Sequence, residues 1–139
     1  MQRFDVIILG GGLVGLTLAI SLGRHGVTCA VVDPADPVST MAPGFDGRVS
    51  AISSASWKMF EAIGIAPHLK DKNCPIDRIW VSEGLTGGAL DFTPDGDDGA
   101  TGFMVENREL RLALEKTVQG IADVTRFQPD KPVDVVRDD

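Results

Sequence analysis

Cysteine is scarce in this chain of 139 residues, which contains only Cys29 and Cys74. One lies in an apolar run and the other precedes a proline, and the two do not form a C-x-x-C pair. This pattern argues against a disulfide framework and against a cysteine-based redox motif. We therefore expect two thiols without a redox role, in a reducing compartment.

Long apolar runs and an excess of basic residues are also missing. No apolar stretch approaches the roughly 20 residues of a membrane-spanning helix, and the N-terminus lacks the pattern of a cleavable signal. Asp and Glu (20) outnumber Lys and Arg (13), and the net charge of −7 argues against nucleic acid or an anionic membrane as partner. We expect a cytoplasmic protein with no transmembrane segment.

The remaining composition, 43% hydrophobic and 24% charged, is ordinary for a globular protein. The length suits one domain with its own core, but it is too short for a dinucleotide-binding domain together with a full substrate domain.

Glycine is plentiful, and three glycines form a recognisable pattern. An apolar run over residues 4–9 is typical of a strand buried on both faces, and Gly10, Gly12 and Gly15 follow it at G-x-G-x-x-G spacing. The first glycine permits a tight turn, the second lets a pyrophosphate approach the backbone, and the third lets the next helix pack closely. The pattern predicts a dinucleotide-binding turn.

The segment after the turn completes a βαβ unit. Residues 13–25, beginning with Leu13 and Val14, are predicted as a helix whose free N–H groups and positive dipole end face the pyrophosphate. Residues 28–32 predict a second strand, and Asp33 follows it, 18 residues after Gly15, where a carboxylate can accept hydrogen bonds from a ribose diol. No cation follows Asp33, so NADP is disfavoured at this site, and FAD and NAD both stay open.

The middle of the chain is predicted to be a loop followed by a helix. Residues 34–47 are rich in proline and glycine and end in Asp46-Gly47-Arg48. Ser50 or Ser53 can cap a helix that Gly64 ends, and residues 66–70 add a short turn. We predict that Trp57 and Phe60 on this helix belong to the core.

The second half predicts a hairpin, a helix and two further strands. Residues 76–82 and 89–92 are predicted as strands joined by a turn at Gly87 and Gly88, and residues 94–102 as a solvated hairpin tip. Acids in the tip approximate the spacing of a calcium loop, but Gly99 and Ala100 break it, and we expect no metal site. Residues 103–106 lead into a helix over 107–118 capped by Asn107, and strands follow at 124–127 and 133–136.

Arg108 is an unusual residue for its position. A cation in the first turn of a helix opposes the helix dipole, which is explained if an anion binds there. The alternative is that its side chain reaches solvent or Glu106. The residues alone do not decide between the two.

Four segments together carry a family resemblance: GGGLVGLTLAISLGRHG, Asp33, DGRVSAISSASWKMFEAIGI and VENRELRLAL. They resemble the N-terminal part of the flavoprotein aromatic-ring hydroxylases, most closely the ubiquinone-biosynthesis hydroxylase branch. The likeness covers nearly the whole chain. It implies a mixed α/β fold, a Rossmann-like FAD-binding domain with a parallel sheet and a small β-hairpin element.

The resemblance also implies roles for particular residues. Gly10, Gly12, Gly15 and Asp33 would hold the ADP half of FAD, Arg48 would lie beside the flavin, and Arg108 would reach the cofactor. The resemblance therefore favours a bound anion as the reason why Arg108 lies in the first turn of its helix. In the intact relatives NAD(P)H reduces FAD, and one oxygen atom of O₂ is transferred to an electron-rich phenol. No catalytic acid or base is identified.

The resemblance further predicts that residues 1–139 are the N-terminal part of an FAD-binding domain, without the distal cofactor-binding segments and the substrate lobe. Such a chain is expected to be inactive alone and to self-associate, and the full protein is compatible with peripheral membrane association. Two alternatives stay open: a part of an FAD-dependent oxidase or dehydrogenase, and a stand-alone nucleotide-binding module.

Overall fold

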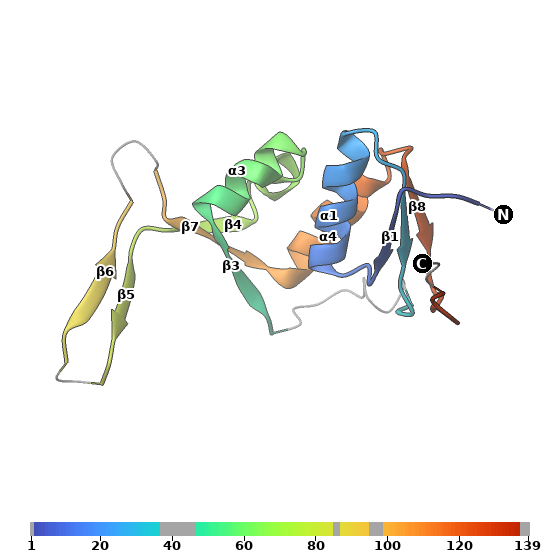
Figure 1. Ribbon diagram of the computed structural model, residues 1–139. Helices are drawn as coiled ribbons and strands as arrows, with labels where there is room; N and C mark the ends of the chain where they lie inside the picture. Colours follow the sequence, from blue (N-terminus) through green and yellow to red (C-terminus); the bar gives the residue numbers. More distant parts are fainter. Residues whose placement is uncertain (1, 37–46, 85–86, 95–98, 137–139) are drawn as a thin grey trace. The chain divides into compact units, whose positions relative to one another are not determined.

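Two units make up the computed structural model, which describes residues 2–36, 47–84, 87–94 and 99–136 (Figure 1). The first unit combines Met1–Phe45 with Leu110–Asp139, and the second is Asp46–Glu109. The boundary between them falls inside helix α4 (Asn107–Val118).

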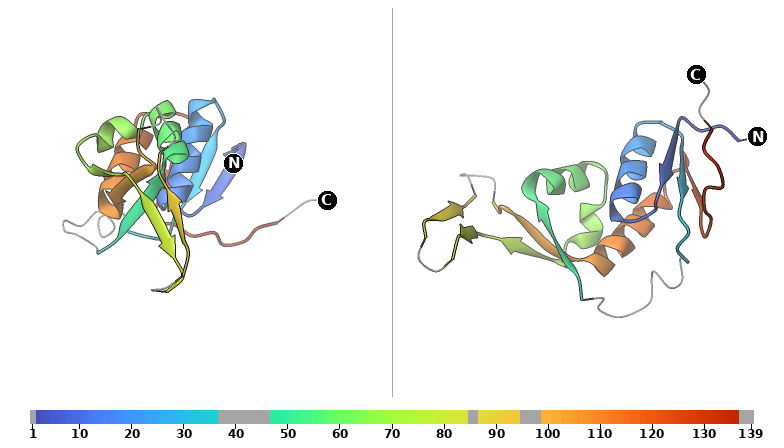
Figure 2. Two further views of the ribbon diagram at one scale, coloured as in Figure 1. Left: turned by 90° about the vertical axis from the view of Figure 1, so that its left-hand side faces the viewer. Right: turned by 60° about the horizontal axis from the view of Figure 1, so that its bottom comes forward.

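The first unit contains the predicted βαβ element. Strand β1 (Val6–Leu9) is followed by helix α1 (Leu13–Arg24) and strand β2 (Cys29–Val32), and β8 (Val124–Phe127) completes a parallel sheet of order β1-β2-β8. Helices α1 and α4 lie on the same side of this sheet in Figure 1 and in the right-hand view of Figure 2. The predicted α/β fold with a parallel sheet is confirmed.

One face of this sheet is covered and the other is not. On β1, Ile8 lies under α1 and is 8% exposed, whereas its neighbours Ile7 and Leu9 are 65% and 58% exposed on the opposite face. The expectation that β1 is buried on both faces is wrong for the residues described, because helices cover only one side of the sheet. Cys29 of β2 is fully buried, and burial raises the pKa of its thiol, so it stays protonated near neutral pH.

The second unit is built on an antiparallel sheet. Strands β3 (Val49–Ser53), β7 (Gly102–Glu106) and β4 (Asn73–Ile76) pair in the order β3-β7-β4. Helix α3 (Ser54–Ala62) packs against β3 and β7, and the 3-10 helix η1 (Ala66–Leu69) follows it.

Helix α3 begins and packs as predicted. The hydroxyl of Ser53 accepts a hydrogen bond from the amide of Ser56 at 3.2 Å, so Ser53 is the cap, and Ser50 instead lies in β3. Trp57 and Phe60 are 9% and 6% exposed, which confirms their place in the core.

A two-stranded hairpin extends from the second unit. Strand β5 (Ile79–Ser82) pairs antiparallel with β6 (Ala89–Phe92), as predicted. One face is wholly apolar and remains open to solvent; its residues and their exposed fractions are Ile79 (39%), Val81 (51%), Leu90 (64%) and Phe92 (50%). On the other face Arg78 pairs with Asp91 at 2.6 Å and lies over the Trp80 ring.

Two predicted strands need correction. Residues 76–82 are not one strand, because β4 ends at Ile76 and β5 begins at Ile79. Residues 133–136 have no regular secondary structure and are exposed. Strand β3 was not predicted, and the predicted tip at 94–102 lies partly outside the described residues.

Among the helices described, none has the length and apolar character needed to cross a bilayer.

Candidate functional site

The glycine turn between β1 and α1 has the geometry that its sequence predicts. Gly10 has a φ of +108°, a conformation that disfavours any residue with a Cβ. A Cβ on Gly15 would lie 1.9 Å from the carbonyl oxygen of Gly10, so only glycine lets α1 start this close to the turn. The first and third glycines therefore have the predicted structural roles.

The second glycine leaves open space at the start of α1. A Cβ on Gly12 would meet no atom within 4 Å, so no packing within the described residues requires a glycine there. Gly12 is also the N-cap of α1, with no capping side chain and no acid in the first turn, and Val14 is 84% exposed. The first amides of the helix, including those of Leu13 and Val14, thus have no negative partner among the described residues.

Asp33 lies directly beside this turn. Its Oδ2 accepts a hydrogen bond from the amide of Gly11 at 2.5 Å, and its Oδ1 accepts one from the amide of Ala35 at 2.7 Å. A Cβ on Gly11 would lie 3.2 Å from this carboxylate, which explains the glycine at a position outside the G-x-G-x-x-G pattern. Since each carboxylate oxygen has a second lone pair, Asp33 can still accept from a ligand hydroxyl.

A network from β8 supports the segment around Asp33. The Asp33 amide donates to the carbonyl of Phe127 at 3.1 Å, and the Asp33 carbonyl accepts from the amide of Asp130 at 2.9 Å. Gln128 donates to the carbonyl of Ala35 at 2.9 Å. Arg126 in turn pairs with Gln128 and with Glu115 of α4. Sequence reasoning missed this support, because no local pattern marks partners this far apart in the chain.

The second unit brings the two predicted arginines together. The amide of Asn107 donates to the carbonyl of Arg48 at 3.1 Å, and Val49 is paired with Glu106 in the ladder between β3 and β7. The Ser50 hydroxyl also donates a hydrogen bond to Oδ1 of Asn107 at 2.5 Å. Strand β3 therefore holds Asn107, the residue predicted to cap the helix over residues 107–118. Arg48 and Arg108 therefore lie at the same end of this strand pair.

Arg108 is held by an acid that sequence reasoning did not identify. Its Nη1 donates to Oε1 of Glu109 at 3.1 Å, and Oε2 of Glu109 lies 3.5 Å from Nζ of Lys72. Glu106, the acid considered as partner from the sequence, is not the one that pairs with it. The Nε of Arg108 is buried and has no hydrogen-bond partner among the described residues. An unpaired buried donor on a cation is a position at which an acceptor anion would be stabilised.

The first prediction concerns the carboxylate beside the glycine turn. Asp33→Ala is expected to weaken FAD binding by about 1–3 kcal/mol, the range for a lost charge-assisted hydrogen bond. Equilibrium titration measures this change. Asp5→Ala is the matched control, because Asp5 also accepts from a backbone amide, that of Thr28 at 2.9 Å, but lies away from the turn. Equal effects of the two variants would contradict a ligand role for Asp33.

The second prediction separates the two explanations of Arg108. Arg108→Ala is expected to weaken FAD binding by about 1–3 kcal/mol, because the cation and its unpaired Nε are lost. Arg111→Ala, one turn further along α4, is the control. If Arg108→Ala instead stabilised the protein against thermal unfolding and left FAD affinity unchanged, Arg108 would be a mismatch with the helix dipole and not a ligand.

Comparison with known proteins agrees with this geometry. A parallel βαβ element with a glycine turn and an acid at the end of its second strand defines a dinucleotide-binding fold of the α/β class. Residues 3–130 match the family model described as an FAD binding domain, and the chain belongs to this family.

Two relatives specify the branch of the family. The chain is 38% identical over 134 residues to the ubiquinone hydroxylase UbiL of Rhodospirillum rubrum, which covers 96% of this chain and 31% of the relative. It is 31% identical over 140 residues to 3-demethoxyubiquinol 3-hydroxylase of Escherichia coli, which covers 99% of this chain and 36% of the relative. This is an FAD-binding domain of the kind found in flavoprotein monooxygenases similar to the ubiquinone-biosynthesis hydroxylases, and it spans about a third of these relatives.

Solved structures show the same fold at lower identity. PqsL of Pseudomonas aeruginosa, described as a probable FAD-dependent monooxygenase, matches with a TM-score of 0.66 and 24% identity over 90% of this chain and 32% of that one. The flavin-dependent monooxygenase PieE, solved with FAD and substrate, matches with a TM-score of 0.61 and 20% identity over 90% of this chain and 23% of that one. At these identities the likeness supports the fold alone.

Proposed function

We propose that the chain is the FAD-binding portion of a monooxygenase that hydroxylates an electron-rich polyprenyl phenol in ubiquinone biosynthesis, using NAD(P)H and O₂. The observation that carries the proposal is the open space at Gly12 beside the uncapped start of α1, with the Asp33 carboxylate next to the same turn. This arrangement suits a pyrophosphate flanked by a ribose.

In this proposal the residues of the turn and of α1 hold the ADP half of FAD. Gly10, Gly12, Leu13, Val14 and Gly15 supply backbone amides and close approach, and the Asp33 carboxylate accepts from the ribose hydroxyls. In the second unit, the unpaired Nε of Arg108 donates to an oxygen of the cofactor, and Arg48 lies beside the flavin. The residues of the turn therefore fit the ADP half of FAD.

The substrate class rests on the relatives. Two of them are named as a ubiquinone hydroxylase and a demethoxyubiquinol hydroxylase. FAD supplies the redox chemistry, passing electrons from NAD(P)H to O₂ for insertion of one oxygen atom into the ring. This chain's own contribution is to bind and orient the cofactor. We place the protein in the cytoplasm, with peripheral membrane association of the full protein and no nucleic-acid partner.

We also propose that the chain does not hydroxylate substrate by itself. It spans about a third of the length of its relatives, and oxygen transfer needs a cofactor site from which water is excluded. Product formation by the isolated chain, dependent on the aromatic substrate, would contradict this.

Titration with FAD, ADP and NAD⁺ tests the cofactor. We expect FAD to bind and ADP to compete with it, because the residues of the turn recognise the shared ADP half. Binding of NAD⁺ and ADP without any binding of FAD would favour a stand-alone nucleotide-binding module. With the full-length enzyme, incorporation of ¹⁸O from ¹⁸O₂ into product separates a monooxygenase from an FAD-dependent oxidase or dehydrogenase.

The third prediction is that the chain self-associates. Ile7 and Leu9 on β1 and four residues on one face of the β5–β6 hairpin are exposed, and each such side chain gains about 1.5–3 kcal/mol when buried. Light scattering of dilute protein is expected to show species larger than a monomer. Leu90→Lys, on the apolar face, is expected to reduce the association, and Ser82→Lys on the opposite face is its control. A stable monomer that binds no hydrophobic dye would overturn the prediction.

A further inference from the structure

Arg108 and Glu109 form an unusual pair at the start of α4. Neighbouring residues of a helix ordinarily point to different sides of it, yet Nη1 of Arg108 donates to Oε1 of Glu109 at 3.1 Å. The two side chains are 29% and 18% exposed, so water screens this ion pair less than it screens a pair on an open surface. The proposed contact of Arg108 with the cofactor does not use this bond, which therefore needs its own explanation.

The Glu109 carboxylate is held at both of its oxygens. Oε1 accepts from Arg108, and Oε2 lies 3.5 Å from Nζ of Lys72. The backbone that carries Lys72 is itself fixed, because the Lys72 amide donates to the carbonyl of Leu69 at 2.9 Å and Leu69 is fully buried. The carboxylate is thus held in one place, from which it can orient Arg108.

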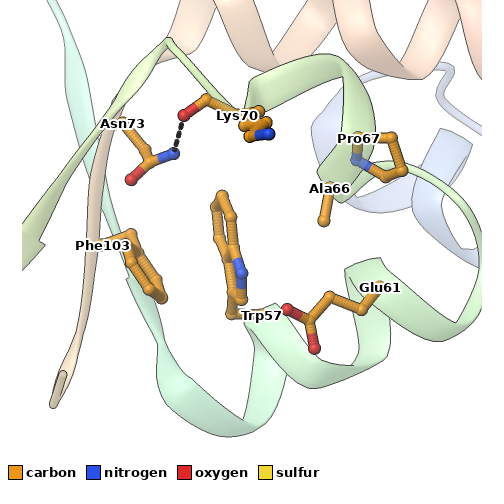
Figure 3. A pocket seen from close by; sticks show the side chains of 7 residues that line it. All are labelled: Trp57, Glu61, Ala66, Pro67, Lys70, Asn73 and Phe103. Carbon is orange, nitrogen blue, oxygen red and sulfur yellow. Dashed lines mark hydrogen bonds between the residues drawn. The ribbon is translucent and has the colours of Figure 1, made fainter. Parts of the chain in front are cut away.

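Further hydrogen bonds anchor the two segments that carry these side chains. The side-chain amide of Asn73 donates to the carbonyl oxygens of Leu69 at 2.8 Å and Lys70 at 3.1 Å. Figure 3 shows the bond from Asn73 to Lys70 as a dashed line. The start of α4 is tied to β3 through Asn107. The contact between the two segments therefore joins parts of the second unit that are already ordered.

Glu109 bonds to one side of the Arg108 guanidinium and not to its binding edge. Nε and Nη2 form the edge with which an arginine binds two oxygens at once. Arg78 of the hairpin uses this edge, because its Nε and Nη2 donate to Oδ1 and Oδ2 of Asp91 at 2.8 and 2.6 Å. In Arg108 the bond to Glu109 is made by Nη1, outside this edge, and the buried Nε has no partner among the described residues.

We propose that Glu109 is a positioning residue for Arg108: by holding Nη1, it presents the edge formed by Nε and Nη2 to anionic oxygens of the cofactor. This inference rests on the proposed function, in which Arg108 donates to an oxygen of FAD. Glu109 acts through Arg108 and does not itself touch the cofactor. An acid in the first turn also stabilises the helix dipole, and the experiment separates the two roles.

FAD titration of two substitutions at this position tests the proposal. Glu109→Ala removes both the acceptor and the charge, and we expect it to weaken FAD binding roughly 3- to 10-fold, the effect of one lost hydrogen bond. Removal of a carboxylate beside a cation would by itself strengthen the binding of an anion, so the sign of the change identifies positioning. Glu109→Gln keeps an acceptor oxygen for Nη1, and we expect it to bind FAD as tightly as the unmodified chain or more tightly.

Two controls show whether the effect passes through Arg108. Glu61→Ala removes an exposed acid of the same unit and is expected to leave FAD affinity unchanged. In the Arg108→Ala background, Glu109→Ala is expected to cause no further weakening, because there is no guanidinium left to orient. An acid that acted only on the helix dipole would lower thermal stability in Glu109→Ala and Glu109→Gln alike and would leave FAD affinity as it is.

The proposal is overturned if Glu109→Ala binds FAD as tightly as the unmodified chain or more tightly, if Glu109→Gln weakens binding as much as Glu109→Ala, or if Glu109→Ala weakens binding by the same factor in both backgrounds. Arg108→Ala distinguishes this failure from a failure of the proposed function. If Arg108→Ala weakens FAD binding and Glu109→Ala does not, the positioning role alone is wrong. If neither variant weakens it, the contact of Arg108 with FAD is wrong as well.

Discussion

Gly12→Val is expected to lower the affinity for FAD by roughly 100-fold or more while the fold is retained, because the valine side chain would occupy the space that a pyrophosphate needs. The structure makes this a clean experiment. A Cβ at Gly12 would meet no atom within 4 Å among the described residues, so the substitution begins in open space. FAD titration gives the affinity, and thermal unfolding without FAD shows whether the fold is unchanged.

Gly88→Val is the control for that experiment. A Cβ at Gly88 would also meet nothing within 4 Å, and the residue belongs to the second unit, close to the hairpin strand β6. We expect it to bind FAD as the unmodified chain does. Unchanged flavin binding by Gly12→Val would mean that the dinucleotide does not approach this turn.

Gly15→Ala is expected to have the opposite profile, with a large loss of stability. Its Cβ would lie 1.9 Å from the Gly10 carbonyl oxygen, which is backbone and cannot rotate away. The turn and the start of α1 must separate, and overpacking of this kind costs about 3 kcal/mol or more. Thermal unfolding is expected to shift downward by roughly 10 °C or more for a chain of this size.

Gly23→Ala provides a graded comparison for Gly15→Ala. A Cβ at Gly23 would lie 2.7 Å from Cγ2 of Ile121 and 2.8 Å from Cγ2 of Val124, which are the ends of side chains. These groups can shift, so we expect a smaller loss of stability than at Gly15. If the two variants were equally stable, the close packing of α1 on the glycine turn would not be the reason for the third glycine.

The βαβ element was predictable from the sequence because its signals are local. The apolar runs, the three glycines and the position of Asp33 all lie within one continuous stretch, and each reflects a constraint on its own backbone. Strand β3 was not predictable in the same way. Val49–Ser53 is short, and its strand conformation depends on pairing with β7, whose residues follow about fifty positions later.

The wrong strand at residues 133–136 has the same physical origin. Valines in this segment favour a strand locally, but no described strand pairs with it, and Val133 and Val136 are 96% and 77% exposed. A β-branched residue stabilises a strand mainly through packing and cross-strand contacts. Without a partner strand, the local preference of these valines did not produce a strand.

Sequence reasoning found the candidate site in part. The glycines and Asp33 were identified by spacing, but Gly11 and Glu109 were missed, because their importance comes from the side chain or backbone that faces them. Gly11 is constrained by Asp33, 22 positions away. Glu109 is the neighbour of Arg108, yet only the three-dimensional position of Lys72 shows it lying between two cations.

The contact between Arg108 and Glu109 affects the rate at which an anion binds to Arg108. An arginine side chain in water samples many rotamers, and an anion can bind only while the side chain is in a suitable one. Here one nitrogen of the guanidinium is already held by Glu109, while the buried Nε has no partner within the part of the chain that the structure describes. An arriving anion therefore meets a donor whose direction is already set. Loss of Glu109 should leave the charge of Arg108 in place and slow the capture of the anion.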